Sequence, residues 1–128
     1  MLDASAAFDY LLDDGPSGDW VRQLLSGEEE LAAPQLIDLE LISALRRRVL
    51  RRELTVPRAR EALADFTEVA LIRYPATDFL TSIWAMRSRL NPYDAVYVVL
   101  SEALAVPLAT TDARLARSHG HRAEIIAP

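Results

Sequence analysis

Apolar and polar residues follow two patterns along the chain. In some stretches apolar residues recur every three or four positions, as on one face of an α-helix, and in others they form short runs typical of buried strands. The short runs predict strands over residues 1–3, 31–33, 69–73, 107–110 and 123–126. The helical periods predict helices over residues 5–14, 20–25, 35–52, 55–66, 77–86, 92–105 and 113–118. Helices that alternate with short strands predict an α/β fold, with a central parallel β-sheet flanked by α-helices on both faces.

Particular residue types indicate where helices begin. Ser5, Thr77 and Asn91 favour the N-cap position, so we expect each of them to cap the helix that follows it. Residues 15–18 read GPSG, which predicts a turn between the first two helices. The helix after Asn91 is apolar on nearly every face, which predicts that it is buried.

Length and composition limit the class of protein. The 128 residues predict a single domain, over residues 1–128, with one hydrophobic core. Although 51% of the residues are hydrophobic, no apolar run approaches the roughly 18 residues of a transmembrane helix. No basic segment followed by an apolar stretch opens the chain, so we expect no signal peptide. The absence of cysteine excludes disulfides and thiolate metal sites and fits a cytoplasmic protein.

The charge of the chain is acidic overall but locally basic. A net charge of −5 argues against non-specific wrapping of nucleic acid. The chain contains no lysine, and its densest basic run comprises Arg46, Arg47, Arg48, Arg51 and Arg52. This run either contacts phosphate groups or complements the dipole at the end of a helix, and the sequence leaves both interpretations open.

Four acidic residues carry the candidate chemistry. Asp3, Glu40, Asp94 and Asp112 are far apart in the sequence, yet each stands in a local context that directs it toward a common place. In open α/β sheets the ligand crevice lies beyond the carboxyl ends of the strands, where Asp3 and Asp112 are expected. Carboxylates converge readily when a divalent cation neutralises them. The pattern therefore indicates metal-dependent hydrolysis, with a phosphodiester as the substrate.

Capping offers a structural alternative for two of these acids. Asp112 lies between a predicted strand and a helix and is suited to be an N-cap. Asp94 is the third residue after Asn91, where an acid favours a helix N-terminus. Ser5 is the better cap for the first helix, which leaves Asp3 without a capping role.

The contexts of Glu40 and Asp94 favour a site over a purely structural role. Glu40 forms a polar stripe with Ser43 and Arg47 on a helix that is apolar over most of its circumference and is otherwise expected to be buried. A Glu–Arg contact on a solvated face is the alternative. Asp94 shares its helix face with Tyr97 and Ser101, which suggests polar groups entering a cavity.

Together these segments resemble a known family. The motifs LDASA, ELISALRR, PYDAVYVVLSEAL and PLATTD occur in the order and spacing of PIN domains, and specifically of the VapC-type ribonuclease toxins of bacterial type II toxin-antitoxin pairs. The resemblance covers essentially the whole chain. It implies Mg²⁺ or Mn²⁺ held by an acidic cluster, endonucleolytic cleavage of RNA, and inhibition by a small cognate antitoxin. Asp3, Glu40, Asp94 and Asp112 match the family's acidic positions as catalytic and metal-binding residues, and Ser5 matches the hydroxyl residue beside the first aspartate.

One departure from the family concerns the first strand. Only Met1 and Leu2 precede Asp3, whereas relatives have several apolar residues there. Either this strand is unusually short or the true start lies upstream.

Two other functions are alternatives to the nuclease, a receiver-like domain and an inactive binding module. A receiver-like Mg²⁺-binding signalling domain also gathers acids at strand ends, but it depends on a lysine, which this chain lacks. A catalytically inactive PIN-like binding module would have lost carboxylates, and all four are present. High apolar content, with Trp20 and Trp84 on candidate exposed helices, predicts a homodimer. His119 and His121 are expected at the surface, and neither is needed as a general base.

Overall fold

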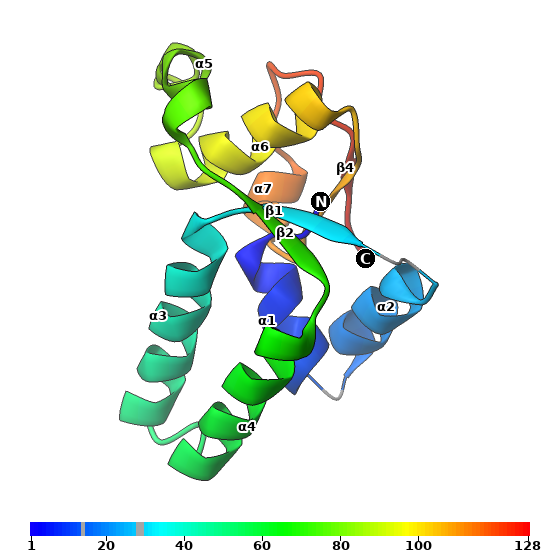
Figure 1. Ribbon diagram of the computed structural model, residues 1–128, viewed down its shortest axis with the longest axis vertical. Helices are drawn as coiled ribbons and strands as arrows, with labels where there is room; N and C mark the ends of the chain where they lie inside the picture. The colour runs from blue at the N-terminus through cyan, green and yellow to red at the C-terminus, as the bar shows by residue number, and fades with distance from the viewer. Residues whose placement is uncertain (14, 28–29) are drawn as a thin grey trace.

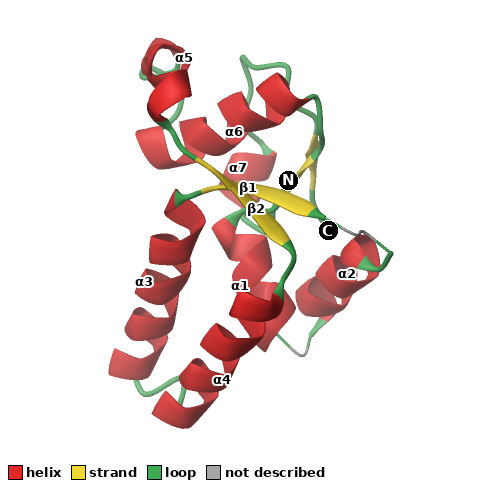
Figure 2. Cartoon of the chain, viewed as in Figure 1, coloured by secondary structure: helices red, strands yellow, loops and turns green. Residues whose placement is uncertain are grey.

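The computed structural model describes residues 1–13, 15–27 and 30–128. In chain order its elements are α1 (Ala4–Leu12), α2 (Pro16–Leu25), β1 (Leu31–Pro34), α3 (Leu36–Leu50), α4 (Val56–Glu68), β2 (Leu71–Tyr74), the 3₁₀ helix η1 (Thr77–Phe79), α5 (Leu80–Ala85), α6 (Pro92–Leu104), β3 (Leu108–Ala109), α7 (Ala113–Ala116) and β4 (Ile125–Ile126). Helices α1 to α4 lie on one side of β1 and β2, and α5 and α6 lie on the other (Figures 1 and 2). The predicted α/β class is therefore confirmed.

Two pairs of parallel strands are joined through the first three residues. Strand β1 pairs with β2 and β3 pairs with β4, both in parallel. Leu2 forms a parallel bridge with Ala109, and its N–H donates to the carbonyl of Ala32 at 2.9 Å. The order across the sheet is thus β2, β1, residues 1–3, β3, β4. Residues 1–3 thus take part in the sheet through the single bridge at Leu2.

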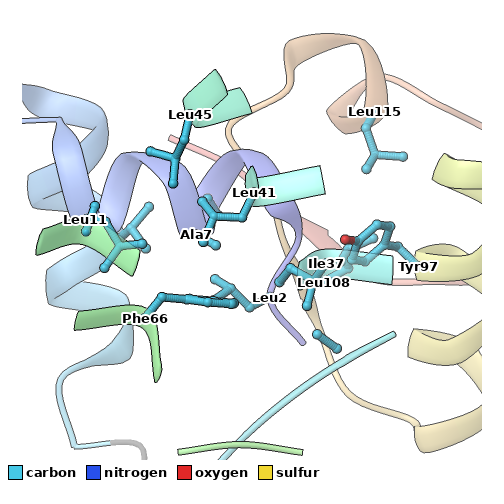
Figure 3. Packing of buried hydrophobic residues seen from close by; sticks show 14 of the residues in the cluster. Leu2, Ala7, Leu11, Ile37, Leu41, Leu45, Phe66, Tyr97, Leu108 and Leu115 are labelled. Atoms are coloured by element: carbon cyan, nitrogen blue, oxygen red, sulfur yellow. The ribbon is translucent and has the colours of Figure 1, made fainter. Parts of the chain in front are cut away.

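The core fills the space between this sheet and the helices. Leu2, Ile37 and Leu108 have exposed fractions of 1% or less, and they meet in one apolar cluster with Phe66 and Tyr97 (Figure 3). Helix α6 is buried from Ala95 to Ser101, as its apolar sequence predicts. Helix α6 contacts β1 and β3, and its residue Asp94 and the strand-end residue Asp3 both act on the charge of Glu40.

Helix α3 departs from its prediction. Only the face with Ile37, Leu41 and Leu45 is buried, while the side chains of Leu39 and Leu50 are 68% and 65% exposed. The expectation of a helix buried over most of its circumference is wrong, because no element covers the outer face of α3 among the described residues. Apolar surface is thereby left open to solvent.

The start of α1 also differs from the prediction. Asp3, not Ser5, is the N-cap, and its carboxylate accepts a hydrogen bond from the backbone N–H of Ala6. The prediction of Ser5 as the cap is wrong: both residue types cap well, and the bridge at Leu2 fixes which of them precedes the first turn. Helix α1 ends at Leu12, and its predicted end at Asp14 lies outside the described residues.

Residues 16–18 begin helix α2, where the sequence predicts a turn. The carboxylate of Asp13 accepts hydrogen bonds from the backbone N–H groups of Gly15 at 3.0 Å and Gly18 at 2.8 Å. These bonds satisfy helix-start donors and lower the pKa of Asp13. A Cβ on Gly18 would lie 1.9 Å from the carbonyl oxygen of Asp13, so only glycine permits this close approach.

Of two further predicted helix caps, one is correct and one is wrong. Asn91 caps α6 by accepting from the N–H of Asp94 at 2.9 Å, as predicted. Thr77 instead is the first residue of η1, whose start has no side-chain cap.

Within the described residues, no helix combines the length and apolar character that a membrane crossing needs.

Candidate active site

Asp3, directly after the bridge residue Leu2 in the middle of the sheet, lies at the centre of a hydrogen-bond network. Its carboxylate accepts from the hydroxyl of Thr110 at 2.6 Å, from the hydroxyl of Ser5 at 2.8 Å and from the N–H of Ala6 at 2.8 Å. The side chain is 5% exposed. Burial raises the pKa of Asp3, against the lowering effect of these three donors. The network fixes one orientation of this carboxylate.

Ser5 connects the start of α1 to the loop before α7. While its hydroxyl donates to Asp3, its oxygen accepts from the backbone N–H groups of Thr111 at 3.0 Å and Asp112 at 3.1 Å. A single side chain thus links Asp3 to Asp112, whose positions in the sequence are more than a hundred residues apart.

Glu40 reaches the site from α3. The phenol of Tyr97 in α6 donates to its carboxylate at 2.7 Å. Burial raises the pKa of Glu40, and the negative charges of Asp3 and Asp94 raise it further, while the Tyr97 bond lowers it. The partner of Glu40 is therefore Tyr97, and the alternative of a Glu40–Arg47 contact on a solvated face is wrong.

Asp94 occupies the first turn of α6. Its carboxylate accepts from the amide of Asn91 at 2.7 Å and from the guanidinium of Arg114 at 2.9 Å. Burial raises the pKa of Asp94, and the charge of Arg114 opposes this effect. Ser101, predicted to share a cavity with Asp94, instead donates to the carbonyl of Val106 at 2.6 Å.

Asp112 is a helix cap that also lies close to Arg114. It is the N-cap of α7, with its carboxylate accepting from the N–H of Arg114 at 2.7 Å. It also lies 3.8 Å from the guanidinium of Arg114, which it shares with Asp94. Capping therefore holds Asp112 in place while its charge still acts on Asp3 and Asp94.

The four predicted acids form one electrostatic group. The charge of Asp112 raises the pKa of both Asp3 and Asp94, and the charges of Asp3 and Asp94 raise the pKa of Glu40. The fold thus brings residues from α1, α3, α6 and the start of α7 within interaction range of one another. Such mutual repulsion is the condition that a bound cation relieves.

The donor set suits a hard divalent cation. Carboxylate and hydroxyl oxygens are the ligands that Mg²⁺ and Mn²⁺ prefer, and the site offers no soft ligand. In the described part of the chain, no three acidic or histidine side chains are drawn close enough to form a compact metal cage. Since Mg²⁺ keeps several water molecules, a wide site of separate carboxylates still fits it.

The sequence pointed to four acids but missed their partners. Thr110 and Arg114 flank Asp112 in the run TTDAR, and their proximity to it was the available signal. The bond between Tyr97 and Glu40 had no such signal, because the two residues lie on different helices. His119 is exposed, as predicted, whereas His121 is partly buried and contacts the hydroxyl of Ser118 at 2.9 Å.

Comparison with known proteins places the chain in a family. The profile of the PIN domain matches residues 1–119. Ribonuclease VapC9 of Mycobacterium tuberculosis is 43% identical over 115 residues, which cover 90% of this chain and 87% of the relative. Ribonuclease VapC12 of the same species is 39% identical over 125 residues, covering 98% of this chain and 95% of the relative. Ribonuclease VapC1 is 41% identical over 126 residues, with 98% and 94% covered.

Proposed function

We propose, because the chain belongs to the PIN-domain family, that it is a metal-dependent endoribonuclease that cleaves RNA phosphodiester bonds as a toxin in the cytoplasm. The observation that carries the proposal is the group of four interacting carboxylates, three of which have a raised pKa. Curated relatives of nearly the same length are named as ribonucleases, which supports the same chemistry here. A receiver-like domain has no support from these comparisons.

Each acid has a place in the proposed metal site. Asp3 and Asp94 would bind Mg²⁺ or Mn²⁺ directly, and Glu40 and Asp112 would complete the site directly or through water. The bound cation would supply activation of water and neutralisation of charge on the phosphoryl oxygens. Thr110 and Ser5 hold Asp3, and Tyr97 holds Glu40, so that the carboxylates need little reorganisation.

The proposal extends to two protein partners. A small cognate antitoxin would cover the site and offer a cation, such as an arginine, to the carboxylates. The exposed side chains of Leu39 and Ile42, which flank Glu40 on α3, support an apolar contact beside the site. A homodimer is the second proposed contact, and Trp84, 68% exposed, supports it. Trp20, also expected at such a surface, packs instead against the core.

Charge-removing variants test the nuclease activity. Asp3→Asn and Asp94→Asn should each lower Mn²⁺-dependent cleavage of RNA strongly, because each removes a ligand charge and little volume. Asp78→Asn is the matched control, since Asp78 lies on η1 outside the acidic group. Cleavage would be followed on single-stranded RNA by gel electrophoresis, with circular dichroism to confirm folding. Wild-type rates in the two variants, or full activity in EDTA, would contradict the proposal.

Expression in cells tests the toxin role separately. Expression of the chain alone should arrest growth, and co-expression of a small protein encoded next to it should relieve the arrest. Sequencing of RNA ends after induction would identify the cleaved RNA. A chain that leaves growth unchanged and captures no small partner would contradict the toxin role even if the nuclease proposal holds.

A further inference from the structure

A hollow of about 350 Å³ adjoins the acidic group on the side of Asp94. It lies between the segment that precedes α6 and the turn that follows α7. Its cationic walls are Arg89, Arg114 and Arg117, and His119 also lines it. We call this feature the arginine hollow. Its volume falls within the range of small-ligand sites in proteins.

The arginine hollow is positively charged, although the chain as a whole is acidic. The whole chain carries −5, whereas this wall brings together three guanidinium groups with the carboxylate of Asp94 at its edge. Arg114 is paired with Asp94 at 2.9 Å. Among the described residues, neither Arg89 nor Arg117 forms an ion pair with an acid, so two of the three charges have no counterion there.

Backbone contacts hold one of these unpaired arginines in the wall. Arg89 donates from its guanidinium to the carbonyl of Gly120 at 2.8 Å. Gly120 has φ +81°, and a Cβ at this position would lie 2.9 Å from the Cδ of Arg89. The turn around Gly120 therefore both needs glycine and leaves room for the Arg89 side chain. The carbonyl that holds this guanidinium carries no charge, so the positive charge of Arg89 is not neutralised and can attract an anion.

Arg114 connects the hollow with the acidic group. Its guanidinium contacts Asp94 and lies 3.8 Å from Asp112, and it also faces the hollow. An anion in the hollow would thus lie beside the carboxylates proposed to hold the cation. RNA supplies such an anion at every nucleotide, and guanidinium groups bind phosphate through charge-assisted hydrogen bonds.

We propose that the arginine hollow binds phosphate groups of the RNA on one side of the bond that is cleaved. The inference rests on the proposed nuclease function and adds a substrate-binding site to it. Arg117 and Arg89 supply the charge that the phosphates neutralise, and Arg114 marks the boundary with the acidic group. RNA binding should therefore be sensitive to salt, and removal of one arginine should reduce this sensitivity.

Binding of RNA to Arg117→Gln tests the proposal. The probe is a fluorescein-labelled single-stranded RNA of mixed sequence, and its anisotropy is measured in EDTA at several salt concentrations. Arg117→Gln should weaken binding several-fold and lower the slope of log K against log salt by about 0.7, the value for one phosphate contact with a single strand. Arg60→Gln, an exposed position on α4, makes the same change of charge and should bind as the wild type does.

The outcomes separate this site from the nuclease proposal. With Mn²⁺ present, Arg117→Gln should raise KM for RNA while kcat stays near the wild-type value. Equal RNA binding by Arg117→Gln and Arg60→Gln would overturn the proposal that the arginine hollow binds RNA, even if the wild type cleaves RNA. Arginine-dependent binding by a wild type that cannot cleave RNA would support the hollow and contradict the nuclease. If Arg117→Gln binds RNA as the wild type does but no longer binds a protein partner, the hollow is a protein-binding site and the proposal that it binds RNA is overturned.

Discussion

Tyr97 donates a hydrogen bond of 2.7 Å to Glu40, a residue 57 positions earlier in the chain. Burial and the neighbouring Glu40 carboxylate raise the pKa of Tyr97 far above its ordinary range. The phenol therefore remains a donor wherever the protein is folded. Its bond also lowers the pKa of Glu40, against the raising effect of burial.

Tyr97→Phe should shift the pH dependence of RNA cleavage. Loss of the donor raises the pKa of Glu40 further, so the acidic limb of the kcat/KM profile should move to higher pH. The variant should also lose about 1 kcal/mol of stability, the usual net value of one hydrogen bond. Tyr93→Phe is the control, because Tyr93 is 59% exposed. Unchanged pH profiles in both variants would show that Glu40 does not need its phenol partner.

Thr110→Val should weaken Mn²⁺ binding and cleavage. The substitution keeps the shape of this fully buried side chain but removes the 2.6 Å bond to Asp3 and an acceptor for the N–H of Asp112. Thr110→Ser retains the hydroxyl and should stay close to wild type. Calorimetric titration with Mn²⁺ would compare the two variants. Equal metal affinity in both would mean that Asp3 keeps its orientation without Thr110.

Without metal, the protein should become less stable as pH rises. The folded-state pKa values of Asp3, Glu40 and Asp94 lie above their ordinary values, near 3.8 for Asp and 4.5 for Glu. The folded state therefore binds more protons than the unfolded state just above these values. The stability that these groups contribute is fully present below their ordinary pKa and is lost as pH rises through the raised values.

Melting curves in EDTA and in Mn²⁺ would check this dependence. In EDTA the melting temperature should fall as pH rises above about 4, and the fall should be smaller in Asp3→Asn, which has one titrating group fewer. Millimolar Mn²⁺ should raise the melting temperature at neutral pH, because a cation that binds only the folded state stabilises it. A melting temperature insensitive to both pH and Mn²⁺ would contradict the acidic metal site.

Ala105→Gly should stabilise the protein without altering cleavage. Ala105 follows α6 with φ 53° and ψ 43°, a left-handed conformation that favours glycine. The gain should be about 1 kcal/mol in urea unfolding. Ala103→Gly, at an exposed position inside α6, should instead cost about 1 kcal/mol. A loss of stability at both positions would show that the left-handed conformation at Ala105 carries no strain.

The sequence predicted local features of the fold better than long-range ones. The α/β class, the Asn91 cap and the burial of α6 all follow from period and residue type within one segment. The outer face of α3 was predicted wrongly, because an apolar face looks the same in the sequence whether or not another element covers it. The start of α1 depended on the bridge at Leu2, a contact with residue 109 that no local pattern encodes.

The same limit applies to the site. The four acids could be selected because each stands at a strand end or in an unusual helix context, and the structure brings them within interaction range. Their orienting partners could not be selected, since serine, threonine and tyrosine occur throughout the chain for other reasons. The arginine hollow could not be predicted because its cations come from separate segments, unlike the dense run at residues 46–52.

The bond between Thr110 and Asp3 joins two positions that are 107 residues apart. During synthesis on the ribosome the N-terminus emerges first, and Asp3 must wait for Thr110, Asp112 and Arg114 before its surroundings exist. Contacts of such long sequence separation form late in folding. A growing chain therefore carries an incomplete acidic group until nearly all of it has been translated. The proposed nuclease should thus stay inactive while it is still attached to the ribosome, next to the RNA that encodes it.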